Sequence, residues 1–288
     1  MLFRSNGFDV DQKLASILDN VDVVLTGHTH DAIPRAIKIK NTLLLSSGSH
    51  GKYLGRIDLK VDNGKVVDFS SNLIPIFSDV IQPDPEMTRL IDKIREPYEE
   101  ECNRVVGAAE TLLYRRGNFG GPWDSVICDA IIQERDTEIS LSPGFRWGTT
   151  LLPGQKITID DIYSQTSMNY PEVYRTEMSG ETIKNLLEDV CDNIFNPDPF
   201  FQQGGDMVRV GEMTYTCQPK NTMGNRINDL KLSNGEKIES QKKYTVGGWG
   251  SINPEVEGPP IYKLLENYVS NEKIIKPKYN NPVSVKGI

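Results

Sequence analysis

The sequence predicts a chain of two domains that mixes α/β and α+β structure. Short apolar runs typical of strands alternate with longer segments whose apolar residues recur every three or four positions, as they do on one face of a helix. Proline and polar residues interrupt this pattern between Asp79 and Pro85, which indicates a domain boundary. Because 38% of the 288 residues are apolar, the chain can bury a core in each part.

The first part of the chain is expected to hold one helix followed by strands. Apolar spacing predicts a helix over residues 11–18, and the apolar run at residues 21–25 predicts a short buried strand. Asn63-Gly64 between two apolar-rich runs predicts a tight hairpin. We set residues 1–5 aside, since they resemble a translated sequencing adapter. The further strands expected here cover residues 36–39, 42–46, 53–61 and 65–76.

The second part is expected to begin after a linker helix that Pro97 kinks or breaks. Its expected elements are a helix over residues 123–134, a strand over 137–141, a helix capped by Ser179 and a last helix over 261–269. We therefore predict a first domain over residues 1–78, a linker over 79–106 and a second domain over 107–288.

Two histidines follow the first predicted buried strand, and the chain has only three. His28 and His30 are two residues apart, so in an extended or loop segment they can face the same side, as two imidazoles that bind one metal cluster must. Two solvated loop histidines would give the same pattern. Asp31 either orients a ligating ring or caps the next turn.

A second candidate loop, Ser-Pro-Gly-Phe-Arg-Trp-Gly at residues 142–148, places Arg146 between two aromatic residues. Such a loop suits an anion or a flat ligand, and a surface turn with Arg146 paired to a carboxylate is an equal alternative. His50 lies in a Gly/Ser loop, where we expect a solvated side chain. The four cysteines lack the close spacing of a zinc or redox motif.

The charge of the chain excludes two classes of partner. A net charge of −8 and a pI near 5.1 argue against binding to nucleic acid or to an anionic membrane surface, since both favour basic patches. No apolar run approaches the roughly 18 to 20 residues of a membrane-spanning helix. We expect neither a nucleic-acid partner nor a membrane partner.

Five motifs, taken in this order, resemble the SoxB thiosulfohydrolases, a family within the 5'-nucleotidase group of metallophosphoesterases. Together they are highly specific, whereas Gly-His-Thr-His alone marks only the wider class. They are Asn-Gly-Phe-Asp-Val-Asp (6–11), Gly-His-Thr-His-Asp-Ala (27–32), Leu-Leu-Tyr-Arg-Arg-Gly-Asn-Phe (112–119), Ser-Pro-Gly-Phe-Arg-Trp-Gly-Thr (142–149) and Phe-Asn-Pro-Asp-Pro-Phe-Phe-Gln-Gln-Gly-Gly-Asp-Met-Val-Arg-Val-Gly (195–211).

The resemblance implies the C-terminal part of a metallophosphoesterase α/β sandwich, followed by a 5'-nucleotidase-type mixed α/β domain that recognises substrate. It implies two manganese ions, with zinc or another divalent metal as the alternative, and His28 and His30 match two of their ligands. Arg146 matches a substrate-binding arginine, and Tyr170 lies beside the position of a substrate-binding aromatic ring. The implied reaction releases sulfate from a cysteine S-thiosulfonate on the SoxYZ carrier arm, in the periplasm.

The sequence also departs from the family pattern. The other ligands of the family come from Asp-x-His, Gly-Asp-x-x-Asp and Gly-Asn-His-Glu segments that this chain lacks, and Ser5 occupies the position of a further ligand histidine. We therefore expect an N-terminally truncated polypeptide that is inactive by itself, and we identify no catalytic residue in it. Residues 6–76 should be poorly stable, whereas the second lobe should fold alone.

Two other functions are compatible with the sequence. The first is a periplasmic 5'-nucleotidase or cyclic-nucleotide phosphodiesterase. Enzymes of that type hold the sugar with Gly-Gly-Asp-Gly-Phe, and Val-Gly-Gly-Trp-Gly-Ser at residues 246–251 lacks the aspartate. The first position of the aromatic base clamp falls at Asn169, and loss of that clamp removes about 1 to 3 kcal/mol of stacking. The second is a non-catalytic binding module.

Overall fold

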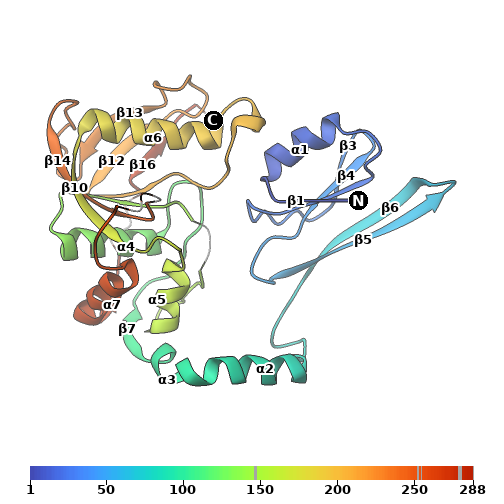
Figure 1. Ribbon diagram of the computed structural model, residues 1–288, viewed down its shortest axis with the longest axis horizontal. Helices are drawn as coiled ribbons and strands as arrows, with labels where there is room; N and C mark the ends of the chain where they lie inside the picture. Colours follow the sequence, from blue (N-terminus) through green and yellow to red (C-terminus); the bar gives the residue numbers. More distant parts are fainter. Residues whose placement is uncertain (146–147, 252, 254, 278–280, 288) are drawn as a thin grey trace. The chain divides into compact units, whose positions relative to one another are not determined.

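The computed structural model describes residues 1–145, 148–251, 253, 255–277 and 281–287. The chain forms two compact units (Figure 1). Unit 1 contains residues 1–95 together with 196–205, and unit 2 contains residues 96–195 and 206–288. The domain limits expected from the sequence, 78 and 107, stay a prediction. The return of residues 196–205 to unit 1 was not expected, because it depends on contacts between segments far apart in the chain.

Unit 1 is built on a four-stranded sheet in the order β1-β2-β4-β3, with β3 antiparallel to its neighbour. Setting residues 1–5 aside was wrong for the fold, since residues 2–4 form β1 against β2. Strand pairing uses backbone N–H and C=O groups, so a segment can pair whatever the origin of its sequence. The elements are β1 (Leu2–Arg4), α1 (Phe8–Ile17), β2 (Val23–Thr26), β3 (Ile37–Ile39) and β4 (Thr42–Ser46).

A long hairpin and a helix complete the first 95 residues (Figure 1). The hairpin joins β5 (Tyr53–Asp62) to β6 (Lys65–Pro75). Its turn residues, Asn63 and Gly64, have φ values of 48° and 73°, as a two-residue turn with both residues left-handed requires. The predicted hairpin is therefore confirmed. Helix α2 (Pro85–Arg95) ends just before the 3-10 turn that contains Pro97, which confirms the predicted break.

Unit 2 is organised around a four-stranded sheet in the order β10-β14-β8-β11. Two three-stranded sheets, β13-β12-β16 and β15-β7-β9, accompany it. The strands are β7 (Val105–Ala109), β8 (Ile139–Ser142), β9 (Lys156–Thr158), β10 (Val173–Ser179), β11 (Arg209–Gly211), β12 (Met213–Cys217), β13 (Ile227–Leu232), β14 (Lys243–Trp249), β15 (Ile274–Ile275) and β16 (Val283–Val285). The helices are α3 (Glu99–Cys102), α4 (Pro122–Arg135), α5 (Ile159–Thr166), α6 (Gly180–Phe195) and α7 (Ile261–Glu272).

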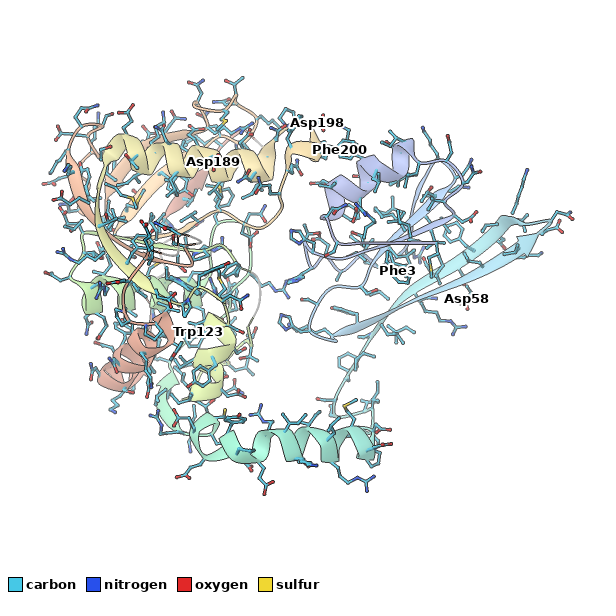
Figure 2. All side chains as sticks on the ribbon, viewed as in Figure 1. Phe3, Asp58, Trp123, Asp189, Asp198 and Phe200 are labelled. Carbon is cyan, nitrogen blue, oxygen red and sulfur yellow. The ribbon has the colours of Figure 1, made fainter. Side chains whose placement is uncertain are left out.

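Unit 2 contains two hydrophobic cores, and unit 1 contains a much smaller one. The first core gathers side chains of α4, α5 and α7 around the fully buried Trp123 (Figure 2). The second gathers side chains of α6 with those of the central sheet and of β12. In unit 1 the corresponding cluster has three buried members, Val23, Leu43 and Leu45. Because each fully buried aliphatic side chain contributes about 1.5 to 3 kcal/mol, unit 2 holds most of the stabilising burial.

The helices of unit 2 confirm one predicted helix cap and show a second capping motif that the prediction did not include. The hydroxyl oxygen of Ser179 accepts a hydrogen bond from the Thr182 amide at 3.1 Å, so the predicted cap of α6 is confirmed. Helix α5 was not predicted, although Thr158 and Asp161 form a capping box at its start. Among the described residues, no helix has the length and apolar character needed to cross a bilayer.

Candidate functional site

The loop that carries His28 and His30, called the histidine loop below, follows directly on β2, as the sequence predicted. His28 and His30 have φ values of 69° and 58°, in the left-handed region that residues with a Cβ rarely adopt. The Thr29 hydroxyl accepts a hydrogen bond from the Phe8 amide at 3.2 Å, which ties the loop to the start of α1. Strained backbone of this kind costs about 1 to 3 kcal/mol for each residue and is found at functional sites.

The segment 196–205 lies against this loop within unit 1. The Nε2 atom of His28 lies 3.2 Å from the carbonyl oxygen of Gln203, a contact that requires the proton on Nε2. Gly204 has a φ of 75°, and a Cβ there would lie 2.8 Å from the His28 ring. Only glycine fits at this position without displacing the imidazole.

Helix α1 also binds this segment, through Lys13. The Lys13 ammonium pairs with the Asp198 carboxylate and lies 4.3 Å from the centroid of the Phe200 ring. The hydrogen bond from Lys13 holds the pKa of Asp198 below its usual value. A charge pair and a cation–π contact therefore hold the segment on which Gln203 lies.

The third histidine also reaches the histidine loop. The rings of His30 and His50 lie edge to face, with 6.3 Å between their centroids. Two hydrogen bonds join the loops, because the Asp31 carbonyl accepts from the Gly48 amide at 2.8 Å and from the Ser46 hydroxyl at 2.6 Å. His50 is exposed, as expected, but its approach to His30 was not predicted, because it depends on how β2 and β4 pair.

The described residues do not by themselves form a metal centre. Among them, no group of three or more histidine, cysteine, aspartate or glutamate side chains is arranged to hold a metal ion. His28 would also have to release Gln203 before its Nε2 could bind a metal. The loop can therefore supply imidazole ligands, but the described part of the chain does not supply a complete ligand set.

Of the two predicted substrate-binding residues, one is described. Tyr170 lies in unit 2 with 43% of its surface exposed, and its carbonyl oxygen accepts a hydrogen bond from the Gly250 amide at 3.2 Å. That bond links the segment before β10 to the loop after β14. Arg146 lies outside the described residues.

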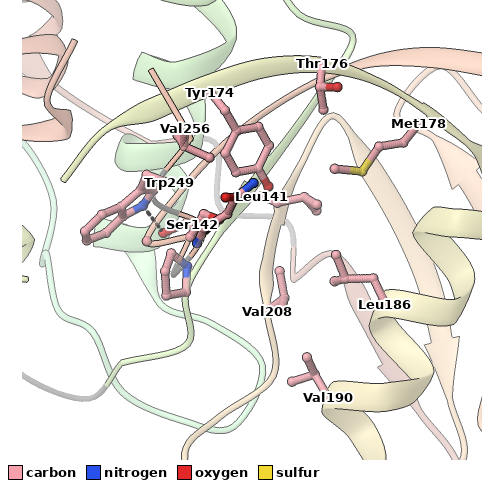
Figure 3. Close-up of a pocket in the computed structure, with 14 residues that line it drawn as sticks. Leu141, Ser142, Tyr174, Thr176, Met178, Leu186, Val190, Val208, Trp249 and Val256 are labelled. Carbon is pink, nitrogen blue, oxygen red and sulfur yellow. Dashed lines mark hydrogen bonds between the residues drawn. The ribbon is translucent and has the colours of Figure 1, made fainter. Parts of the chain in front are cut away.

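Unit 2 contains a cavity of about 610 Å³ between the central sheet and α6 (Figure 3). Its described lining is mostly apolar and includes no charged side chain. The Trp249 indole donates a hydrogen bond to the Ser142 hydroxyl at 2.8 Å, and burial raises the pKa of Tyr174. This volume and lining are typical of a site for the uncharged part of a small ligand. The lining includes Leu141, Ser142, Pro143, Tyr174, Thr176, Met178, Leu186, Val190, Val208, Trp249, Gly250, Ser251, Asn253 and Val256.

A buried network of charges holds the loops beside this cavity. The Asp124 carboxylate accepts a hydrogen bond from Arg115 at 2.7 Å and lies 3.3 Å from the Arg209 guanidinium. Arg209 also pairs with Asp206 at 3.0 Å, and Arg115 donates to the Pro143 carbonyl at 3.0 Å. All four charged side chains are at most 3% exposed, so each depends on the others for neutralisation.

This network was not predicted from the sequence. Arg115 and Asp206 both lie within motifs that carried the resemblance, yet their partners could not be assigned from spacing. The sequence did contain one signal for it, because these charged residues stand in segments that are otherwise apolar or glycine-rich. A charged side chain that is buried in such a segment needs a partner.

Comparison with known proteins identifies the family. Residues 105–252 match the family described as 5'-nucleotidase, C-terminal domain. This chain belongs to that family. The match covers the central sheet of unit 2 and α6, which confirms the expected 5'-nucleotidase-type domain and the mixed α/β fold class.

Solved structures of the 5'-nucleotidase group resemble both units. The sulfate thiohydrolase SoxB of Thermus thermophilus superposes with a TM-score of 0.93 at 31% identity, covering 99% of this chain and 54% of the SoxB chain. The expected resemblance to SoxB is thereby confirmed. A 5'-nucleotidase precursor from Thermus thermophilus superposes with a TM-score of 0.80 at 16% identity, covering 99% of this chain and 62% of its own. At that identity the likeness concerns the fold alone.

Relatives found by sequence act on nucleotides. The trifunctional nucleotide phosphoesterase YfkN of Bacillus subtilis is 25% identical over 246 residues, which cover 81% of this chain and 16% of YfkN. The 5'-nucleotidase of Diplobatis ommata is 27% identical over 153 residues, which cover 45% of this chain and 26% of that protein. The chain thus spans less than two thirds of each relative named here. These relatives are phosphoesterases and a thiohydrolase, so the 5'-nucleotidase group to which the chain belongs consists of hydrolases.

Proposed function

We propose that this chain forms part of a SoxB-type hydrolase that releases sulfate from a cysteine S-thiosulfonate on the SoxYZ carrier arm in the periplasm. The supporting observation is the 31% identity with SoxB, which extends over 99% of this chain. The nucleotidase structure of the same organism reaches 16%. Identity at this level favours the SoxB reaction over the other reactions found on the same fold.

In this proposal, His28 and His30 are ligands of a divalent metal, with manganese as the expected ion. Their loop position supports the role, since both imidazoles are carried by a short loop whose backbone is strained at both residues. The remaining ligands would have to come from outside the described residues, so we derive no catalytic step through the metal. A bound divalent cation would lower the pKa of a water and stabilise charge on tetrahedral oxygens.

The substrate contacts in the proposal are Arg146 and Tyr170. A guanidinium can bind two oxygens of a sulfonate at once, which is the role we assign to Arg146. Tyr170 is 43% exposed, so its ring is available to the part of the substrate that carries the anion. The buried Arg115–Asp124 pair supports this arrangement, since Arg115 binds the carbonyl of Pro143, close to Arg146 in the chain.

A nucleotide phosphoesterase is the second candidate function. The observation that favours it is the similarity to YfkN over 81% of this chain. The cavity of unit 2 also contains two aromatic side chains, Tyr174 and Trp249, and aromatic faces suit a nucleobase. Against it, the sugar-binding aspartate of nucleotidases has no counterpart in the loop after β14.

A chimera with SoxB tests the proposal. This chain would replace the matching 54% of the Thermus thermophilus SoxB chain. The chimera would be assayed with manganese for sulfate release from a carrier peptide bearing a cysteine S-thiosulfonate and for phosphate release from AMP. We expect sulfate release that falls more than about 100-fold in His28→Ala and His30→Ala. Lys60→Ala, on the exposed hairpin, is the matched control and should leave the rate unchanged.

The other outcomes separate the alternatives. Phosphate release from AMP without sulfate release would support the nucleotidase reading and overturn the first proposal. A folded chimera that binds manganese and hydrolyses neither substrate would refute both proposed enzymatic functions. Binding of the carrier peptide by that inactive chimera would then indicate a non-catalytic binding module.

A further inference from the structure

Two cysteines that are distant in the sequence meet inside unit 2. Cys191 lies on α6 and Cys217 ends β12. Their sulfur atoms are 3.7 Å apart, and both side chains are fully buried. The two residues are 26 positions apart, so their spacing alone did not resemble a redox motif. The proposed hydrolase uses neither of them.

We propose that Cys191 and Cys217 are a modification site, at which oxidation forms a disulfide bond that joins α6 covalently to β12. The geometry supports this, because the sulfur atoms of a disulfide are about 2.05 Å apart and the present separation therefore has to shorten by only about 1.7 Å. Cys217 is held by pairing on both sides, with β13 and with β16. Small movements of the two side chains and of α6 would close the remaining distance.

The hydrogen bond between the two cysteines suits thiol–disulfide exchange. The two sulfur atoms share a hydrogen bond that either thiol can donate. With Cys191 as the donor, the bond lowers the pKa of Cys217 and, with burial, raises the pKa of Cys191. The thiolate is the attacking species in exchange, so the cysteine that accepts the bond attacks, and the cysteine that donates it resolves the mixed disulfide.

The reaction balances with a small disulfide as the oxidant. The thiolate of one cysteine attacks one sulfur of the oxidant, breaks its S–S bond and releases one thiol. The other cysteine then loses its proton, attacks the mixed disulfide and releases the second thiol. The protein loses two hydrogen atoms, and the oxidant is reduced to two thiols. Because both sulfurs are buried, we place this exchange before the core closes, or during local detachment of α6.

The disulfide would fix one wall of the cavity in unit 2. Leu186 and Val190 line the cavity and lie on α6, with Val190 directly before Cys191 in the chain. Linking α6 to β12 therefore restrains the side chains that define the cavity. The periplasmic location proposed above would supply an oxidising environment, but the test below uses a defined oxidant and does not depend on that location or on hydrolase activity.

The test refolds the full chain in a buffer of oxidised and reduced glutathione. Remaining thiols are then alkylated in denaturant without reductant, and the protein is analysed by mass spectrometry. We expect two of the four cysteines to be alkylated, Cys102 and Cys128, and a peptide pair cross-linked through Cys191 and Cys217. The oxidised protein should unfold about 5 to 10 °C above the reduced protein.

The variants make the assignment specific. Cys128→Ser should keep both the cross-link and the difference in midpoint temperature, whereas Cys191→Ser and Cys217→Ser should lose both. If those two variants do not fold, the peptide map of the unaltered chain still decides. Four alkylated cysteines in a protein that unfolds cooperatively, or a cross-link to another cysteine, would overturn the proposal.

Discussion

At the scale of single residues, the interior of unit 2 is unusual for the charges that it holds. Asp124 lies between Arg115 and Arg209 and is 3% exposed, and it also accepts a hydrogen bond from the Gly121 amide at 2.9 Å. This carboxylate therefore contacts two guanidinium groups and caps α4, and Asp206 supplies the second negative charge of the network. A buried ion pair adds little net stability over apolar residues, but removing one partner leaves an uncompensated charge.

Asp124→Asn should lower the free energy of unfolding of unit 2 by about 3 to 5 kcal/mol, because it leaves two buried guanidinium groups with one fewer anion. Urea unfolding followed by tryptophan fluorescence would measure the change. Asp58→Asn is the matched control, since its pair with Arg56 has side chains more than 50% exposed, and it should change the free energy by less than about 1 kcal/mol. Equal effects of both substitutions would contradict the assigned role of Asp124.

Cys128 predicts a dependence of stability on alkaline pH. Burial raises the pKa of this thiol from 9.0 to about 12 in the folded chain. The folded state therefore holds the proton where the unfolded state has lost it, so this contribution is complete below pH 9 and is lost as pH rises toward 12. The loss should approach about 1.4 kcal/mol for each pH unit.

The check is to measure the free energy of unfolding of the unaltered chain and of Cys128→Ala at several pH values between 8 and 11. The difference between the two proteins should shrink steadily as pH rises above about 9. A constant difference for Cys128→Ala would rule out a buried neutral thiol.

At the scale of elements, the sequence predicted those turns, helix breaks and helix caps that are determined by residues next to one another in the chain. The turn at Asn63-Gly64, the break at Pro97 and the cap at Ser179 all depend on neighbouring residues, and all three agree with the structure. Helix α5 was missed because it has only eight residues and follows a three-residue strand. Its capping box was nevertheless visible in the sequence.

Thr158→Ala tests the contribution of that capping box. The Thr158 hydroxyl accepts from the Asp161 amide at 3.3 Å, and the Asp161 carboxylate accepts from the Thr158 amide at 2.9 Å. Loss of the hydroxyl should lower the free energy of unfolding by about 1 kcal/mol. Thr150→Ala, at an exposed residue outside any helix, should stay within about 0.5 kcal/mol of the unaltered chain. Urea unfolding of both variants would distinguish a cap from an ordinary surface threonine.

At the scale of the whole molecule, burial is distributed unequally between the units. Unit 2 has two extended cores, whereas the buried cluster of unit 1 has three members. The hairpin β5–β6 has no residue in the buried class. Since local stability follows buried apolar contacts, the first 76 residues should open more readily than unit 2.

Limited proteolysis should therefore remove the N-terminal residues first and leave a resistant fragment that begins between residues 77 and 105. Mass spectrometry would identify its ends, and circular dichroism would show whether it unfolds cooperatively. Early cleavage within α4 or α6, with residues 6–76 intact, would contradict the unequal stability.

The sequence by itself determined the family resemblance, the mixed α/β class, the position of the histidine loop after β2 and the elements with local turn or cap signals. These depend on residue identity and short-range spacing, which can be read along the chain. The tertiary structure alone decided which distant groups meet: His28 with Gln203, His30 with His50, Asp124 with its two arginines, and Cys191 with Cys217. The physical reason is that such pairs are set by strand order and helix packing, where burial selects contacts without regard to their separation in the chain.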